Sequence, residues 1–209
     1  MKISAIIPVK TFSNAKTRLE LNEEKKIDIC KLMLEEVLQT LSISNHVDKI
    51  VIVSKDEEAF QISKKFGAIQ ISDDETGVNN AVTLADDFLK KNDFDASLVI
   101  PQDIPFIKTQ DIDFLMKFQH PPKFTLIVPS RRFDGTNALV RMPVDIMKPH
   151  YDENSYKIHL TTGKSQTLKT SLVFIKRIMM DIDNMDDLKF AIAQNEKLVF
   201  CKKILALMS

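Results

Sequence analysis

Short apolar runs alternate with helical patterns along most of this chain, and this alternation constrains the fold more than any other feature of the sequence. The runs are rich in isoleucine and valine and almost continuously apolar: 2–9, 48–54, 67–72, 96–103, 124–130 and 170–175. Continuous apolar character is typical of strands buried on both faces of a mainly parallel sheet. We therefore predict a central sheet with helices on both sides.

Apolar residues recur at helical spacing between these runs, over 22–41, 55–67, 77–92 and 109–119. Gly67 is placed to end the second of these helices. Strands and helices in alternation imply right-handed crossovers, so we expect a three-layer α/β/α sandwich with a mainly parallel sheet. We expect one domain over 1–209. Within it, 130–170 mixes loop, strand and short helix, and we interpret it as an insertion that builds a second wall over the sheet edge.

Composition excludes several classes of protein. The 209 residues are 44% hydrophobic and 28% charged, which is typical of a globular chain. Lysine plus arginine and aspartate plus glutamate cancel at 29 each, so nothing favours nucleic acid or an anionic membrane as a partner. No apolar segment is long enough to span a bilayer. Cys30 and Cys201 lack metal-ligand spacing, and we interpret them as reduced core residues of a cytoplasmic protein.

The common nucleotide-binding and nucleophilic motifs are missing from the sequence. There is no Walker pattern and no G-x-G-x-x-G, and the chain has only four glycines. This argues against a dinucleotide-binding or P-loop protein. No Ser/His/Asp or Cys/His pairing stands out by its sequence context either.

A basic loop directly follows the first predicted strand and contains Lys10, Lys16 and Arg18. In open α/β sheets ligands bind beyond the carboxyl ends of the strands, where the strand order reverses. The loop therefore predicts a site for an anionic ligand. The alternative is that each of these cations is solvated on the surface, as lysine and arginine usually are.

Asp103 lies just beyond the buried strand "ASLVI" and two residues before Pro105. The proline keeps Ile104 extended, so the turn is stiff and the carboxylate is held in one place. The alternative is that Asp103 only forms the turn, as aspartate commonly does.

A pair of aspartates lies near the end of the chain. If 177–183 is a strand, Asp181 and Asp183 point to one face and Ile182 points to the other. With Asp103 from another strand end, these carboxylates suit Mg²⁺, which takes a few carboxylates together with phosphate oxygens. The alternative is that the pair belongs to the loop and cap before a helix.

That helix is predicted to begin after Asn184, whose side chain suits an N-cap. Asp186 and Asp187 then lie in its first turn, where acidic residues favour the helix dipole. We assign them no function.

These pieces, in this order, resemble the 2-phospho-L-lactate guanylyltransferase family. "IIPVKTFSNAKTRL" is similar to the family's "IIPVK…AK.RL" opening, "GVNNAV" to "GLN.A", and "IPQDIPFI" to "P.D.P". "FDGTNAL" is similar to "GTNAL", "YDENSYKIHL" to "FG..SF..H", and "DIDNMDDL" to "DIDTP.DL". The matches run from residue 3 to about residue 188. "GTNAL" and the last motif are the most specific, whereas "P.D.P" is shared by many nucleotidyltransferases.

The resemblance implies a fold of the glycosyltransferase-A type and transfer of GMP from GTP to 2-phospho-L-lactate or phosphoenolpyruvate, on the route to the deazaflavin coenzyme F-420. It implies Mg²⁺ held by Asp103, Asp181 and Asp183. Catalytic roles fall to Asp103, Lys16 and Arg18. Nucleotide contacts fall to Lys10, Lys16, Arg18, Gly77, Asn79 and Asn80. Contacts to the small phosphorylated three-carbon acid fall to Thr136, Asn137, Ser155 and His159.

The chain departs from the family pattern at Asp152, where glycine is usual. A carboxylate there repels an anionic acceptor unless it turns outward. The tail "CKKILALM" has no counterpart in the pattern, and either packing or self-association as a homodimer is compatible with it. Two alternative functions stay open: another nucleotidyltransferase of this fold, of molybdenum-cofactor or sugar type, and a non-catalytic nucleotide-binding domain.

Overall fold

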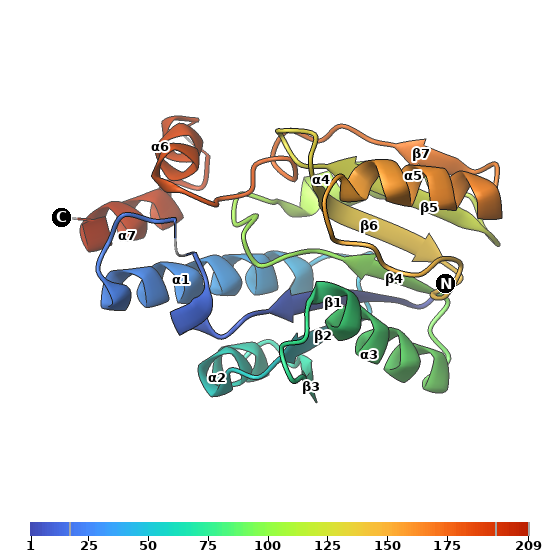
Figure 1. Cartoon of the computed structure of the whole chain (residues 1–209), viewed down its shortest axis with the longest axis horizontal. Helices are drawn as coiled ribbons and strands as arrows, with labels where there is room; N and C mark the ends of the chain where they lie inside the picture. Colours follow the sequence, from blue (N-terminus) through green and yellow to red (C-terminus); the bar gives the residue numbers. More distant parts are fainter. Residues whose placement is uncertain (17, 195, 209) are drawn as a thin grey trace.

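The computed structural model describes residues 1–16, 18–194 and 196–208, and its elements follow the predicted alternation of strand and helix (Figure 1). The strands are β1 Ile3–Val9, β2 Lys49–Ser54, β3 Ile69–Ser72, β4 Ala96–Val99, β5 Phe124–Pro129, β6 Thr136–Met142 and β7 Thr170–Leu172. The helices are α1 Glu23–Ser42, α2 Glu57–Lys64, α3 Val78–Lys91, α4 Thr109–Met116, α5 Ser155–Gln166, α6 Met185–Ala193 and α7 Leu198–Met208. A short 3₁₀ helix, Phe12–Asn14, follows β1.

The seven described strands form one sheet in the order β3-β2-β1-β4-β6-β5-β7. The pairs β1–β2, β2–β3, β1–β4 and β5–β7 are parallel, whereas β6 is antiparallel to both of its neighbours. From β1 the chain moves outward to β2 and β3, and then returns to place β4 on the other side of β1. The strand order therefore reverses between β1 and β4, which puts a ligand crevice beyond their carboxyl ends.

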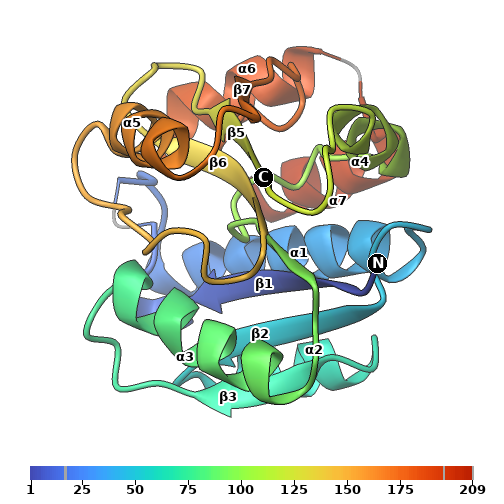
Figure 2. The same cartoon turned by 90° about the vertical axis from the view of Figure 1, so that its right-hand side faces the viewer.

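Helices cover both faces of the sheet, as the sequence predicts. Alternate residues of β1 face the two layers: Ala5 and Ile7 join the core beneath α1 and α7, whereas Ile6 joins the core beneath α3. Figure 2 shows α1, α4 and α7 on one side of the sheet and α3 and α5 on the other. The three-layer α/β/α sandwich is confirmed.

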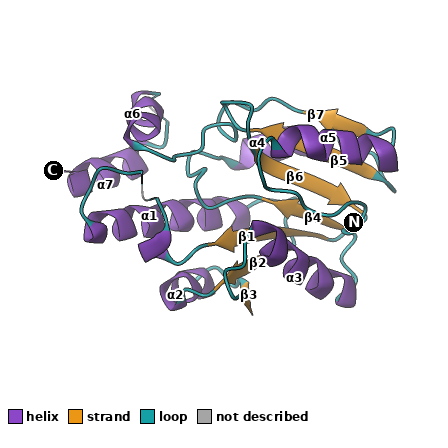
Figure 3. Ribbon diagram, viewed as in Figure 1, coloured by secondary structure: helices purple, strands orange, loops and turns teal. Residues whose placement is uncertain are grey.

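The region 130–170 contributes more to the sheet than an added wall. Its strand β6 lies between β4 and β5, inside the sheet, and its helix α5 covers β5 and β7 (Figure 3). The same region therefore builds both the scaffold and the rim on one side of the crevice.

The C-terminal elements pack onto the face that carries α1. Asn184 caps α6 as predicted, because its side chain accepts a hydrogen bond from the Asp187 N–H. In α7, the Phe200 ring meets Phe106 edge-on, with 5.4 Å between centroids. Lys197, just before α7, pairs with Glu36 of α1 at 3.1 Å. The tail therefore packs through one face. No helix within the described ranges combines the length and apolar character needed to cross a bilayer.

Candidate active site

The loop after β1 carries the three predicted cations, and buried residues hold it in place. Phe12 is buried, and its N–H donates a hydrogen bond of 2.8 Å to the carboxylate of Asp56. Leu19 is buried at the other end of the loop. Between them Lys16 has φ +51°, a left-handed conformation that residues other than glycine seldom adopt. The loop thus turns Lys16 inward and leaves Arg18 exposed.

The ammonium of Lys16 lies between two of the predicted acidic residues. Its Nζ is 2.7 Å from a carboxylate oxygen of Asp103 and 2.7 Å from one of Asp183, and the lysine side chain is only 9% exposed. Burial opposes the charged form, but the two carboxylates outweigh it, so the pKa of Lys16 is raised. For Asp183 burial likewise opposes charge, yet Lys16 and nearby arginines lower its pKa. The contact is therefore an ion pair in which the lysine is largely withdrawn from solvent and the two carboxylates stay partly exposed.

Asp181 lies beside this bridge and is held by an amide. Asn137 Nδ2 donates to its carboxylate at 3.1 Å and also to the Ile178 carbonyl at 2.9 Å. Burial raises the pKa of Asp181 to about 6, the Asn137 hydrogen bond opposes this, and the charges of Asp103 and Asp183 add to it. The carboxylates of Asp103 and Asp183 are thus close enough to Asp181 to interact with it electrostatically. In the arrangement described, however, no group of three acidic, histidine or cysteine side chains is placed to hold a metal ion.

The segment 177–183, considered in the sequence as a possible strand, is not a strand. The described chain is irregular there because its backbone groups pair outside any ladder: the Ile182 N–H donates to the Asp103 carbonyl at 2.9 Å, and the Met179 carbonyl accepts from the Arg131 N–H at 2.9 Å. Ile182 is nevertheless buried, and the flanking aspartates reach the crevice. Asp181 and Asp183 therefore face the cleft and Ile182 faces the core, as in a strand, although the segment is irregular.

A cleft of about 640 Å³ opens at the reversal of strand order. Its lining includes these residues from the sequence predictions: Lys10, Lys16, Arg18, Asp103, Thr136, Asn137, Ser155, Asp181 and Asp183. The cations come from the loop after β1, and the hydroxyl and amide groups come from β6 and the start of α5. One cleft therefore joins the predicted phosphate-binding loop to the predicted acceptor wall.

His159 stands behind that wall and does not line the cleft. It is fully buried, and the His150 N–H donates to its Nε2 at 2.9 Å, so the ring proton is on Nδ1 and is donated to Thr136 Oγ1 at 2.9 Å. Burial lowers the pKa of His159 to about 3, helped by the charges of Arg141 and His150. The prediction that His159 contacts the acceptor directly is not met in this geometry, because its ring is turned toward Thr136.

Thr136 is oriented by this arrangement. Its oxygen accepts from His159 Nδ1 and from the Ser155 hydroxyl at 3.1 Å. With two bonds accepted, the Thr136 hydroxyl proton is left to be donated elsewhere, and the residue lines the cleft. Thr136 is therefore a preset hydrogen-bond donor on the acceptor wall.

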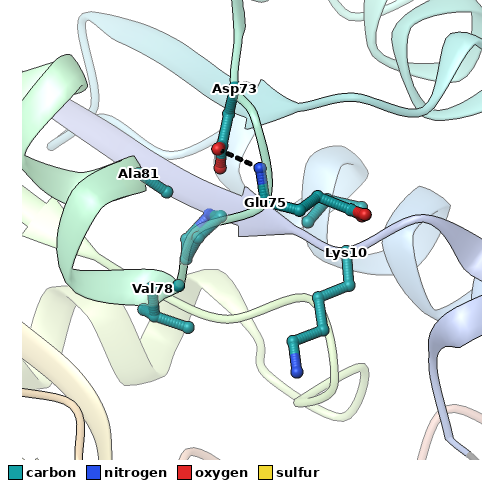
Figure 4. Close-up of a pocket in the computed structure, with 8 residues that line it drawn as sticks. Lys10, Asp73, Glu75, Val78 and Ala81 are labelled. Atoms are coloured by element: carbon teal, nitrogen blue, oxygen red, sulfur yellow. Dashed lines mark hydrogen bonds between the residues drawn. The ribbon is translucent and has the colours of Figure 1, made fainter.

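A small hollow of about 40 Å³ adjoins the cleft and shares Lys10 and Val78 with it (Figure 4). Gly77 lines it at the start of α3 with φ +124°, a conformation that favours glycine. Asp73 Oδ1 accepts from the Glu75 N–H at 2.5 Å. The carboxylate of Glu75 in turn accepts from the Thr11 N–H, so the rim of the hollow is tied to the loop after β1.

Asn79 and Asn80 diverge in the structure. Asn79 joins the two sides of the cleft: its side chain accepts from the Tyr151 N–H at 2.7 Å and donates to Asp152 at 3.1 Å. Asn80 is exposed on α3, and the described linings of the cleft and the hollow do not include it. Asp152 does line the cleft, with a side chain that is 70% exposed, so its charge is partly satisfied by Asn79 and by solvent.

The family model described as "Guanylyl transferase CofC like" matches residues 3–199. The chain belongs to this family. Its similar relatives include the 2-phospho-L-lactate guanylyltransferase of Methanocaldococcus jannaschii, 31% identical, with 90% of this chain and 81% of the relative covered. The phosphoenolpyruvate guanylyltransferase of Sphaerobacter thermophilus is 28% identical, with 90% and 92% covered. The resemblance inferred from the motifs is confirmed.

Solved structures agree on the fold of this guanylyl transferase family member. A protein from Desulfovibrio desulfuricans G20, described as a nucleotide-diphospho-sugar transferase, superposes with a TM-score of 0.77 at 16% identity, covering 100% of this chain and 94% of its own. A cytidylyltransferase from Leptospira borgpetersenii gives a TM-score of 0.62 at 14% identity, covering 99% and 94%. These two proteins therefore share the α/β sandwich fold of this chain.

Asp187 has a structural role beside the cleft that the sequence did not reveal. Beyond its place in the first turn of α6, its buried carboxylate accepts from Arg131 at 2.8 Å and from Arg132 at 2.8 and 2.9 Å. It also accepts from the Asp183 N–H at 3.2 Å. Two adjacent arginines in the sequence were the available signal, but their partner lies more than 50 residues away, at separations of 55 and 56.

Proposed function

We propose that this chain transfers GMP from GTP to a small phosphorylated three-carbon acid and releases pyrophosphate. The family match supports the reaction class, and curated relatives named for phospholactate and for phosphoenolpyruvate support the acceptor class. The observation that carries the proposal is the Lys16 bridge to Asp103 and Asp183 in a cleft at the reversal of strand order. The bridge brings together a cation that can bind phosphate and carboxylates that can bind a metal ion.

In the proposed reaction an oxygen of the acceptor phosphate attacks the α-phosphorus of GTP. A new oxygen–phosphorus bond forms while the bond from the α-phosphorus to the pyrophosphate oxygen breaks, and pyrophosphate takes the electron pair. The nucleophile is already anionic near neutral pH, so no general base is required. This fits a site in which His159 is neutral and turned away from the cleft.

Catalysis then depends on alignment and on neutralised charge, because the two substrates are both polyanions. Lys10, Lys16 and Arg18 line the same side of the cleft and would stabilise the departing pyrophosphate. On the opposite side, Thr136 offers its hydroxyl proton to the acceptor, and Ser155, which lines the same wall, donates its own proton to Thr136. The residues assigned to these roles from the sequence all line the same cleft.

We also propose that the reaction uses Mg²⁺ held by Asp103, Asp181 and Asp183. Carboxylate oxygens are the ligands that Mg²⁺ prefers, and two of these carboxylates already share one cation, the ammonium of Lys16. Asp103 and Asp183 would therefore offer two converging carboxylates to a divalent ion once Lys16 turns to the triphosphate, and Asp181 would have to move toward them to complete the set. When bound, such an ion supplies positive charge between the reacting phosphates.

For the base, we propose that the small hollow beside Lys10 accepts guanine. The buried side chain of Asp73 lines the hollow and uses Oδ1 for the Glu75 N–H, which leaves Oδ2 as an acceptor. Guanine presents adjacent N–H donors on its Watson–Crick edge, whereas adenine presents an acceptor beside a donor. A carboxylate therefore favours GTP over ATP.

Pyrophosphate release tests the proposal against its two alternatives. The protein is incubated with Mg²⁺, each of the four nucleoside triphosphates, and phosphoenolpyruvate, phospholactate or a sugar 1-phosphate. We expect release only with GTP and a phospho-acid. Release with a sugar phosphate favours a sugar nucleotidyltransferase, and GTP binding without any release favours a non-catalytic binding domain.

A further inference from the structure

The acceptor side of the cleft has an unbalanced charge. The described lining residues from position 130 onward include four acids and neither lysine nor arginine; the acids are Asp134, Asp152, Asp181 and Asp183. A phosphorylated carboxylic acid brings two anionic groups to this wall. One of them, the phosphate, can be neutralised by a shared metal ion and the cations of the loop after β1. The carboxylate finds no lysine or arginine among these described lining residues.

Arg131 and Arg132 are placed beside this wall, directly after the cleft residue Ser130. Both guanidinium groups bind the single carboxylate of Asp187, which is 5% exposed, while the arginine side chains are 42% and 43% exposed. Two positive charges thus share one negative charge. Either arginine can leave without stranding a buried carboxylate, because the other remains bound to it.

The two arginines differ in what else holds them. The Arg131 N–H donates to the Met179 carbonyl at 2.9 Å, and its guanidinium lies over the Phe190 ring, 4.8 Å from the centroid. Among the described contacts, the side chain of Arg132 has only Asp187 as a partner. Arg131 is therefore the fixed member of the pair and Arg132 the one that can turn.

The negative charges that act on Arg132 include two carboxylates of the cleft. The carboxylate of Asp187 contributes most to the raised pKa of Arg132, and Asp181 and Asp183 contribute as well. Arg132 is thus within electrostatic reach of two acids that line the acceptor wall. Its planar guanidinium suits a carboxylate, which it can bind through two parallel hydrogen bonds.

We propose that Arg132 turns from Asp187 into the cleft and binds the carboxylate of the acceptor acid, while Arg131 keeps Asp187 in place. This inference rests on the proposed function, since it assigns a residue to the acceptor of that reaction. It makes Arg132 the residue that distinguishes a phospho-acid from a simple phosphate ester.

Calorimetric titration of phosphoenolpyruvate tests the assignment. The protein is loaded with Mg²⁺ and an α,β-methylene analogue of GTP, which cannot release pyrophosphate, and titrated as wild type, Arg132→Gln, Arg132→Lys and the matched control Arg131→Gln. Losing a charge-assisted pair is expected to weaken binding at least about tenfold in Arg132→Gln. Arg132→Lys should recover part of the affinity, and Arg131→Gln should stay within about twofold of the wild type.

Ethyl phosphate, which has no carboxylate, serves as the second probe. Wild type and Arg132→Gln should bind it equally, because Arg132 has no partner on it. Equal losses of phosphoenolpyruvate binding in Arg131→Gln and Arg132→Gln, with a lowered unfolding temperature in both, would overturn the inference and make the pair a structural clamp. So would a wild type that binds neither phosphoenolpyruvate nor phospholactate. A wild type that binds the acid through Arg132 but releases no pyrophosphate from GTP would overturn the proposed function alone.

Discussion

The ammonium of Lys16 lies 2.7 Å from the carboxylate of Asp183, a residue 167 positions further along the chain. Asp103, from the end of β4, accepts from the same ammonium at the same distance. The bridge therefore joins the loop after β1, the turn after β4 and the segment before α6. It forms only when the sheet is complete, which makes the site a property of the tertiary fold.

Replacing either bridged carboxylate should disable the reaction without unfolding the protein. We expect Asp103→Asn and Asp183→Asn each to lower kcat by about 10²-fold or more, as loss of a charge-stabilising group commonly does. Asp186→Asn, an exposed acid three residues from Asp183, is the matched control and should keep its activity. Steady-state pyrophosphate release and far-ultraviolet circular dichroism measure the two effects. Wild-type rates in both folded variants would contradict the mechanism.

Removing the lysine should open the carboxylates to a metal ion. In the nucleotide-free protein the ammonium of Lys16 competes with any divalent cation for Asp103 and Asp183. We expect Lys16→Met to bind Mn²⁺ at least about tenfold more tightly than the wild type, since two partly exposed carboxylates lose the cation that they share. Electron paramagnetic resonance of free Mn²⁺ gives the affinity. Lys176→Met, an exposed lysine on another loop, is the control, and a wild type that binds Mn²⁺ as tightly as Lys16→Met contradicts the competition.

Asp73 should set the choice of base. In Asp73→Asn the retained oxygen still accepts from the Glu75 N–H, and the new amide donates toward the hollow. The edge of guanine then meets a donor, so KM for GTP should rise by roughly 10- to 100-fold relative to ATP. Asp74→Asn, its exposed neighbour, should change neither constant. An unchanged ratio of GTP to ATP turnover in Asp73→Asn would remove guanine from this hollow.

The buried imidazole of His159 should make stability depend on pH. Its pKa is lowered to about 3 in the folded state, whereas an unfolded histidine titrates near 6.5. The unfolded chain therefore binds this proton first, and stability is lost as the pH falls below about 6.5. Between pH 7 and pH 5 the loss from this group is about 2 kcal/mol.

Urea unfolding at the two pH values measures that loss, with His159→Gln as the comparison. The variant cannot titrate, so its stability should fall less over the same interval. Nitrogen chemical shifts of the wild-type ring give a second readout that does not require the variant to fold. A His159 ring that is protonated at pH 5 in the folded protein would contradict the expectation.

The sequence predicted the parallel strands well because burial on both faces leaves a plain pattern: β1 and β2 are nearly unbroken apolar runs. It revealed β6 only as part of a mixed region. The reason is chemical, since β6 carries Arg141 with no exposed surface, and this arginine pairs with Asp86 of α3 at 2.5 and 2.8 Å. A charged residue within a strand sequence suggests a solvent-exposed position, unless the buried residue that pairs with it is known.

The site was predicted in the same uneven way. Asp103 and Asp183 were expected to converge because residues that follow parallel strands meet at one edge of a sheet. The lysine between them was expected to face the triphosphate, and its bridge to both acids was not foreseen. The pairing of Asp187 with Arg132 was missed, since it depends on how the loop between β5 and β6 lies against α6.

The most direct test of the central claim is the fate of isotope-labelled acceptor in the presence of GTP and Mg²⁺. Phosphoenolpyruvate or phospholactate is prepared with ¹⁸O in its phosphate group, and the products are identified by mass spectrometry. We predict a guanylylated phospho-acid that retains all of the label, together with unlabelled pyrophosphate. Label in the pyrophosphate, or no guanylylated product with either acid, would contradict the account.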